Sequence, residues 1–255
     1  MMQHLKTTAT ALLAGAAVLT MSFSSFADHH EVGEKMKNER PAGDIARDAG
    51  RKPDQVLKFL GVKPGMKVWD HASSTGYYTA VLSEAVGRNG MVYAQNRTTS
   101  WERLKDALAP RYEKLGNVEP FAGNITDFEG GDGEFDMVFT ALIYHHMHYS
   151  EASGDGTPDA SKTFYAKAMK MLKPGGMYVI IEHQAPDGTS REDSAGWHRA
   201  SLANAITDLT AAGFEYVGNS DVLANPDDPQ NIPFRELTSG RDSSQRYVAK
   251  FRKPK

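Results

Sequence analysis

Short runs of β-forming residues alternate with helical stretches along most of this 255-residue chain, and this alternation limits the folds that it can adopt. The runs FDMVFTAL and MYVIIE are continuously apolar, which is typical of parallel strands buried on both faces. The alternation therefore predicts an α/β fold, with a mostly parallel sheet and helices on both of its faces. Seven strands are expected, at residues 67–72, 91–96, 118–123, 135–142, 177–185, 215–223 and 245–253.

The last two runs differ from the others because no helical pattern separates them. Residues 224–244, which connect them, are rich in Pro, Asp, Ser and Gly. A parallel crossover usually carries a helix, so we expect the final strand to pair antiparallel, as a terminal β-hairpin. At the other end of the fold, Pro53 and Gly61 are expected to start and stop an amphipathic helix.

The first 27 residues have the three-part pattern of a secretory signal peptide. MMQHLK precedes the apolar run ATALLAGAAVLTMSF, and SSFA follows it. The run is shorter than the roughly 20 residues that span a bilayer, so cleavage after Ala27 is favoured over a retained anchor. The protein is then expected to be exported, periplasmic or secreted. Residues 28–40 are predicted to form a flexible segment and residues 41–255 a single domain.

Composition and charge exclude some functions. The chain contains no cysteine, so disulfide bonds and thiol chemistry are excluded. Its formal net charge is −3, and no basic stretch suggests a nucleic-acid partner. A small-molecule substrate is therefore expected, and the sequence leaves the oligomeric state open.

The stretch VWDHASSTG predicts a strand, a turn and a helix, and LKPGGMYVIIE leads into the fifth strand. With seven strands and a terminal hairpin, these features resemble the class I S-adenosylmethionine-dependent methyltransferases. RKPDQVLKFLGVKPGMKVWD, GYYTAVLSEAVGRNGMVYAQN and YHHMHY are similar in particular to a family of predicted bacterial methyltransferases with exported members. The resemblance covers roughly residues 45–253, and it implies a Rossmann-like sheet and S-adenosylmethionine as cofactor.

The resemblance places the cofactor at the end of the first strand, where the strand order reverses. The family's turn has an acidic residue, an apolar residue and then three glycines at alternate positions. Asp70, His71, Ala72, Ser74 and Gly76 occupy these positions here. Glycine permits a positive φ and a close approach to the ligand, so Ala72 and Ser74 must hold a strained backbone or impose a different turn. The implied cofactor-binding residues are Asp70, Ala72, Ser73, Ser74, Thr75, Gly76, Tyr77, Asn96, Asn124 and Ile125.

Two asparagines stand where the family usually has acidic residues for the ribose and near the adenine. They are Asn96 and Asn124, and exchanging a carboxylate for an amide weakens binding by roughly 1 kcal/mol each. The cofactor pocket is therefore predicted to be degenerate. Asn96 followed by Arg97 has a second interpretation, which is acceptance of a 2′-phosphate. The hydroxyls of residues 73–75 either contact an anionic ligand or cap the following helix.

Five histidines follow the predicted fourth and fifth strands and are expected at the cofactor edge of the sheet. Imidazole titrates near neutral pH, so His145 and His146 are the candidates for a general base in methyl transfer to oxygen or nitrogen. Metal binding with Glu182 or Asp221 is an alternative, although the spacing matches no zinc signature and no metal ligand is assigned. A third possibility is that these histidines only form ordinary hydrogen bonds in loops and at helix caps. The five residues are His145, His146, His148, His183 and His198.

Cleavage after Ala27 would expose Asp28, His29 and His30, a sequence that can bind Cu(II) or Ni(II) or can simply be a polar tail. Three classes of function therefore stay open. The first is a methyltransferase with a degenerate pocket, acting on an unknown small molecule. The others are a non-enzymatic exported binding protein that kept the fold and a histidine-based metal-binding protein.

Overall fold

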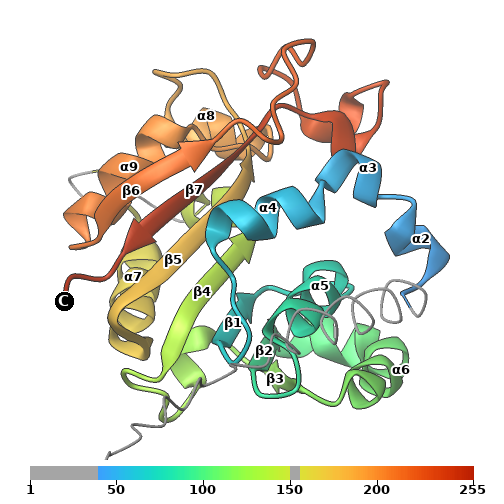
Figure 1. The fold of residues 1–255 in the computed structure, drawn as a ribbon. Coiled ribbons are helices and arrows are strands. Elements are labelled where there is room, and N and C mark those ends of the chain that lie inside the picture. Colours follow the sequence, from blue (N-terminus) through green and yellow to red (C-terminus); the bar gives the residue numbers. More distant parts are fainter. Residues whose placement is uncertain (1–39, 150–155) are drawn as a thin grey trace, which may run out of the picture.

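A seven-stranded sheet forms the centre of the protein (Figure 1). The computed structural model describes residues 40–149 and 156–255. The strands lie in the order β3-β2-β1-β4-β5-β7-β6, so the order reverses between β1 and β4. Their bounds are β1 Lys67–His71, β2 Met91–Asn96, β3 Val118–Ala122, β4 Phe135–Ala141, β5 Leu172–His183, β6 Glu215–Ser220 and β7 Arg246–Arg252.

The pairing confirms the predicted fold class. Strands β1 to β5 are mutually parallel, and β7 lies between β5 and β6, antiparallel to both. The terminal β6–β7 hairpin is therefore as expected. The sequence placed the start of the fifth strand five residues too late, because Leu172 already pairs with Phe135 across an irregularity in the β4–β5 register.

Helices flank the sheet in the intervals that the sequence indicated. The helix that begins at Pro53 ends before Gly61, which has a left-handed φ of 72°, as predicted. The α-helices are α2 Ala42–Ile45, α3 Asp48–Arg51, α4 Pro53–Leu60, α5 Tyr77–Val86, α6 Thr98–Leu115, α7 Asp159–Met171, α8 Arg191–Gly196 and α9 Leu202–Ala211. The 3-10 helices are η1 Ile125–Asp127, η2 Tyr144–His148, η3 Phe234–Glu236 and η4 Arg241–Ser243.

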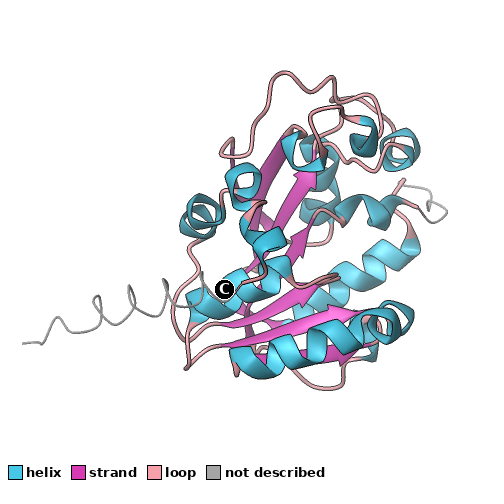
Figure 2. Ribbon diagram, turned by 90° about the vertical axis from the view of Figure 1, so that its right-hand side faces the viewer, coloured by secondary structure: helices cyan, strands magenta, loops and turns pink. Residues whose placement is uncertain are grey.

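Two apolar layers cover the two faces of the sheet, and Figure 2 shows helices on both sides of the strands. On one face, Phe164 of α7 and Leu209 of α9 share a core with Tyr178 of β5. On the other, Val56 of α4 and Leu82 of α5 pack with the central strands. The layers bury most of β1, β4 and β5, and the carboxyl ends of these strands remain available for a site.

The predictions for the N-terminus lie outside the described residues. They are the signal peptide, its cleavage after Ala27, the Asp28-His29-His30 sequence and residues 28–39 of the expected flexible segment. Between residues 40 and 149 and between 156 and 255, no helix has the length and apolar character needed to span a membrane.

Candidate functional site

A pocket of about 260 Å³ opens at the switch point between β1 and β4. Eight of the predicted site residues line it, whereas Gly76, Asn96, Asn124 and Ile125 lie outside the lining that the described residues form. The pocket residues are Arg47, Arg51, Asp70, His71, Ala72, Ser73, Ser74, Thr75, Tyr77, Tyr78, Ala141, Leu142, Ile143, His145, His146, Phe234 and Arg235.

The turn after β1 keeps the backbone of a glycine-rich turn without most of its glycines. Ala72 has a φ of 50°, Ser74 of 54° and Gly76 of 77°, so all three lie in the left-handed region. For a residue with a Cβ this conformation costs about 1–2 kcal/mol. Of the two predicted outcomes, the strained backbone is therefore the one that the chain adopts.

Hydrogen bonds from β2 hold this strained turn. The backbone N–H of Ala72 donates to Gln95 Oε1 at 2.8 Å, and that of Ser73 donates to the Gln95 carbonyl at 2.8 Å. The N–H of Ser74 donates to Asn96 Oδ1 at 3.0 Å, and Asn96 Nδ2 donates to Ser73 Oγ at 2.8 Å. The buried Asn96 amide is thus bonded to the turn, and three backbone donors are satisfied within the protein. Gln95 had no distinguishing sequence signal.

The alternative role for the hydroxyls of residues 73–75, capping of α5, is wrong. Within the described part of the chain no side chain caps this helix, and its N-cap residue is Gly76. A Cβ at Gly76 would lie 2.9 Å from Tyr112 Oη. The positive φ and this close contact explain why the last glycine of the turn is retained.

Two ionisable side chains at the end of β1 are strongly perturbed. Asp70 is 2% exposed, Thr79 Oγ1 donates to its Oδ2 at 2.6 Å, and burial raises the pKa of Asp70 to about 7. Burial, with the nearby charge of Arg97, lowers the pKa of His71 to about 3. The neutral form of each group is therefore favoured compared with its behaviour in water.

His145 of η2 and Glu182 of β5 form a buried pair. Glu182 Oε2 accepts from the backbone N–H of His145 at 3.0 Å and lies 3.1 Å from its Nδ1. A hydrogen on Nδ1 leaves Nε2 with a free lone pair. The neighbouring ring of His146 also lines the pocket, and burial together with His145 and His198 lowers the pKa of His146 to about 4.

The structure divides the five histidines that the sequence grouped. His145, His146 and His198 lie together, and the carboxylate that contacts this group is Glu182 rather than Asp221. The buried His148 instead bonds Asp208 through Nε2 at 3.0 Å. His183 Nδ1 lies 2.6 Å from Ser244 Oγ, and its ring stacks 3.9 Å from that of Phe234.

The remaining predicted residues have other surroundings. Asn124 is exposed and starts η1, where its backbone N–H donates to Asp127 Oδ2 at 2.8 Å. Ile125 is buried in the core beneath that turn. Arg97 is exposed and precedes α6, and Tyr77 Oη donates to Asp48 Oδ1 at 2.6 Å.

Three arginines line the pocket, and sequence reasoning missed them. Arg47 and Arg51 come from the α2–α3 region, and both bond Asp242, at 2.8 and 3.0 Å. Arg235 comes from η3 in the segment between β6 and β7. Only the folded chain brings these cations to one cavity, where Asp242 offsets part of the charge of Arg47 and Arg51 and the remaining positive charge favours an anionic group.

Comparisons with known proteins agree with this architecture. Residues 52–181, half of the chain, match the family model described as protein-L-isoaspartate(D-aspartate) O-methyltransferase (PCMT). The ubiquinone/menaquinone biosynthesis C-methyltransferase UbiE of Shewanella piezotolerans is 30% identical over 136 residues, 51% of this chain and 48% of that protein. A demethylmenaquinone methyltransferase of Staphylococcus aureus is 29% identical over 136 residues, 52% of this chain and 49% of that protein. The chain thus spans about half the length of the curated relatives that it matches.

Solved structures share the fold. A SAM-dependent methyltransferase from Aquifex aeolicus has a TM-score of 0.58 and 21% identity, covering 86% of this chain and 97% of that one. The 1,6-didemethyltoxoflavin-N1-methyltransferase of Burkholderia thailandensis, solved with S-adenosylhomocysteine, has a TM-score of 0.53 and 18% identity, with coverages of 97% and 94%.

The pocket offers several of the groups that S-adenosylmethionine requires. The turn after β1 has the left-handed backbone of a glycine-rich turn, and Arg47 and Arg51 suit the carboxylate of the donor's amino-acid part. The residues fit the group in these respects and depart from it at Asn96, whose amide is taken up by the turn. The predicted cofactor, S-adenosylmethionine, is confirmed at the level of the family. The chain belongs to the protein-L-isoaspartate(D-aspartate) O-methyltransferase (PCMT) family, within the class I S-adenosylmethionine-dependent methyltransferases.

Proposed function

We propose that this protein is an exported methyltransferase that acts on a small molecule through an altered methyl-donor pocket. The observation that carries the proposal is the shared cavity at the β1/β4 switch point. It brings the left-handed turn at Ala72 and Ser74 and the His145–Glu182 pair to the same space. The curated relatives are named as methyltransferases of quinone biosynthesis, which favours a small-molecule acceptor over a macromolecule.

The donor is held, in this proposal, along the turn at residues 70–77. Arg47 and Arg51 bind its carboxylate, and Ser74 and Thr75 contact it from the exposed side of the turn. When bound, S-adenosylmethionine supplies a methyl group to a nucleophile. The altered part is the ribose subsite, since the amide of Asn96 bonds Ser73 and Ser74 and the family's carboxylate is missing. Binding weaker than that of a glycine-rich pocket follows.

His145 is the group best arranged to accept a proton from the acceptor. Its Nδ1–H donates to the fully buried Glu182, which fixes the ring and stabilises the imidazolium that forms. Proton removal takes place at Nε2. His146 is less suited, because a pKa of about 4 makes its ring a weak base at neutral pH.

A non-enzymatic binding protein is the second candidate, and one observation favours it. The backbone N–H groups of Ala72, Ser73 and Ser74 are all bonded to β2, so they offer nothing to a ligand. A protein that no longer binds the methyl donor but keeps the cationic pocket would bind small anions and would not transfer a methyl group.

Export is part of the proposal and rests on the pattern of residues 1–27. The apolar run between MMQHLK and SSFA has the length and flanks of a signal peptide. An exported protein meets little S-adenosylmethionine after leaving the cytosol, so the donor would have to be bound before export or supplied outside.

Calorimetry of the purified protein with S-adenosylmethionine and S-adenosylhomocysteine tests the proposal. We expect saturable binding of both, in the micromolar to millimolar range. Thr75→Arg, which fills the pocket mouth, should abolish it. Thr207→Arg, the same exchange at an exposed position of α9, is the matched control and should leave the affinity unchanged. No binding of either ligand would refute the methyltransferase and leave the binding protein.

A further inference from the structure

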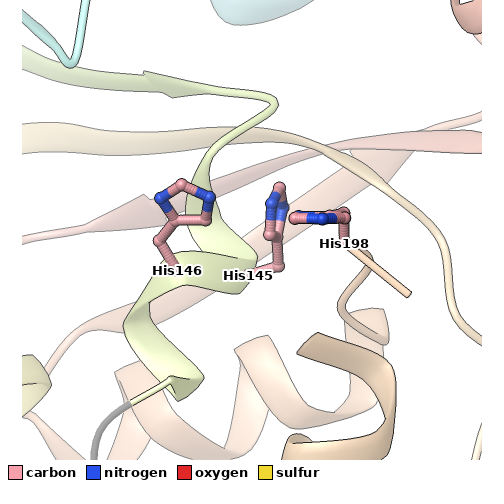
Figure 3. A group of neighbouring side chains, drawn as sticks. All are labelled: His145, His146 and His198. Atoms are coloured by element: carbon pink, nitrogen blue, oxygen red, sulfur yellow. The ribbon is translucent and has the colours of Figure 1, made fainter. Parts of the chain in front are cut away.

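Three imidazole rings from two separate segments meet beside the pocket. His145 and His146 come from η2, and His198 comes from the segment after α8 (Figure 3). One ring nitrogen of each residue lies within 4.8 Å of a ring nitrogen of the other two. The centroid of the His145 ring is 4.6 Å from that of His146 and 5.3 Å from that of His198.

We propose that His145, His146 and His198 form a binding site for a divalent transition-metal ion, Zn²⁺ in the first instance. Three imidazoles with an open fourth position are one ligand set of catalytic zinc sites. A Zn–N bond of about 2.0–2.1 Å places tetrahedral ligand nitrogens about 3.4 Å apart, so the ring nitrogens must approach one another by up to roughly 1.4 Å. His146, which lines the pocket, and His198 are both only partly buried, so neither ring is enclosed in the core.

The second nitrogen of two of the rings already has the partner that a metal ligand needs. His145 Nδ1 lies 3.1 Å from the Glu182 carboxylate, and His198 Nδ1 lies 2.7 Å from Tyr149 Oη. Metal-binding histidines almost always donate their other N–H in this way, which fixes the ring and its tautomer. In both residues Nε2 is left for the metal. The buried negative charge of Glu182 also offsets part of the charge of a divalent ion.

The backbone around the cluster is held in conformations that ordinary residues avoid. His198 has a φ of 55°, and Leu142, two residues before η2, has a φ of 59°. Arg199, fully buried and bidentate to Asp228 at 2.8 and 2.9 Å, anchors the segment that carries His198. Such strain persists where the surroundings enforce it, and it concentrates at functional sites.

The open position of the metal would face the pocket, which His145 and His146 line together with Arg235. The positive charge of Arg235 beside the metal favours an anionic oxygen ligand, such as the carboxylate or phenolate of a small molecule. The inference is independent of methyl transfer, because metal binding is measured directly. It also excludes a base role for His145 while the metal is bound, since both functions use the lone pair of the same Nε2.

The test is a zinc titration of the full chain carrying His29→Ala and His30→Ala, which removes the N-terminal histidines as competing ligands. After chelator treatment, we expect one Zn²⁺ per chain by calorimetry and elemental analysis. Co²⁺ should give the visible absorption of a four-coordinate site. No saturable zinc binding in this background would overturn the proposal.

Variants identify the ligands. His146→Ala and His198→Asn should each weaken zinc binding by about 100-fold or more, and Tyr149→Phe by about tenfold. Asparagine tolerates the left-handed φ at position 198, so this variant keeps the backbone. Thr207→Ala, a change at an exposed position of α9 outside the cluster, is the control and should leave zinc affinity unchanged. Thermal unfolding without metal shows that each variant is folded. Equal zinc affinity in parent, His146→Ala and His198→Asn would contradict the assignment.

Discussion

The side chain of Asn96 is bound to the backbone of Ser74, whose N–H donates to Asn96 Oδ1 at 3.0 Å. The family resemblance assigns Asn96 to ribose recognition, but its side chain instead forms hydrogen bonds with the turn after β1. The relationship links two unusual features of the chain, an amide in place of an acid and a left-handed serine in place of a glycine.

Asn96→Asp is expected to tighten S-adenosylmethionine binding by less than tenfold, because position 96 does not line the pocket that the described residues form. The new carboxylate cannot donate to Ser73 Oγ and is buried, so stability should fall by about 1–3 kcal/mol. Calorimetry and urea unfolding measure the two effects. Asn124→Asp, at an exposed position, is the control. Tightening by tenfold or more in Asn96→Asp would show instead that the carboxylate reaches the ligand.

Ser74→Gly and Gly76→Ala should have opposite effects on stability. Glycine relieves the positive φ of Ser74, worth about 1–2 kcal/mol, although its greater freedom in the unfolded chain offsets part of the gain. Alanine at position 76 adds a Cβ 2.9 Å from Tyr112 Oη at a φ of 77°, so the folded state should lose more than about 1 kcal/mol. Melting temperatures of both variants check this. If both variants changed the melting temperature equally and in the same direction, the backbone at Ser74 would not be strained.

His145→Gln should cut methyl transfer by about 10² or more while leaving the affinity for S-adenosylhomocysteine nearly unchanged. The reason is that Gln cannot accept a proton at the place of Nε2. His148→Gln is a structural comparison, since its ring bonds Asp208 in the core and its loss should lower stability by about 1–3 kcal/mol. Release of S-adenosylhomocysteine in the presence of small-molecule acceptors gives the rate. Unchanged turnover in His145→Gln would remove this residue from the proton transfer.

Asp70→Asn should stabilise the protein more at pH 8 than at pH 5. The pKa of Asp70 is raised from 3.8 to about 7, so the folded chain binds this proton more tightly than the unfolded chain does. The contribution of Asp70 to stability is therefore lost as pH rises from about 4 to 7. We expect a gain on the order of 4 kcal/mol at pH 8 and less than half of that at pH 5. The amide oxygen can still accept from Thr79.

Urea unfolding at the two pH values measures this difference. Burial lowers the pKa of His71 to about 3, so its contribution is lost as pH falls below about 6.5, in the opposite sense. This second effect is present in both parent and variant and cancels in their difference. An Asp70→Asn gain that is the same at pH 5 and pH 8 would show that the carboxyl is not perturbed.

Mass spectrometry of the protein from an exporting cell should find Asp28 as the first residue. The small residues before it suit signal-peptide cleavage, and Ala27→Tyr should block the cut because the bulky ring does not fit. The expected result for that variant is a full-length species in the membrane fraction. A parent protein that keeps Met1 in the soluble fraction would argue against export.

The sequence by itself determined the α/β sheet and the order of its strands and helices along the chain, and it limited the turn after β1 to two outcomes. Continuous apolar runs specify buried strands, and Pro53 and Gly61 specify the ends of a helix, because these signals depend on residues close together in the chain. Alanine and serine at alternate positions before Gly76 were enough to predict either strain or a new turn.

Only the tertiary structure decided which polar groups meet. Asn96 and Ser74 are 22 residues apart, and Arg47 and Asp242 are 195 apart, yet each pair is hydrogen-bonded. His145 and His148 lie in the same 3-10 helix, but one contacts Glu182 and the other Asp208. Side-chain partners of this kind depend on where β5, α9 and the β6–β7 connection come to lie after packing. The residues next to each polar group in the sequence do not specify those positions. The partner of each group therefore depends on burial and long-range hydrogen bonding in the folded chain.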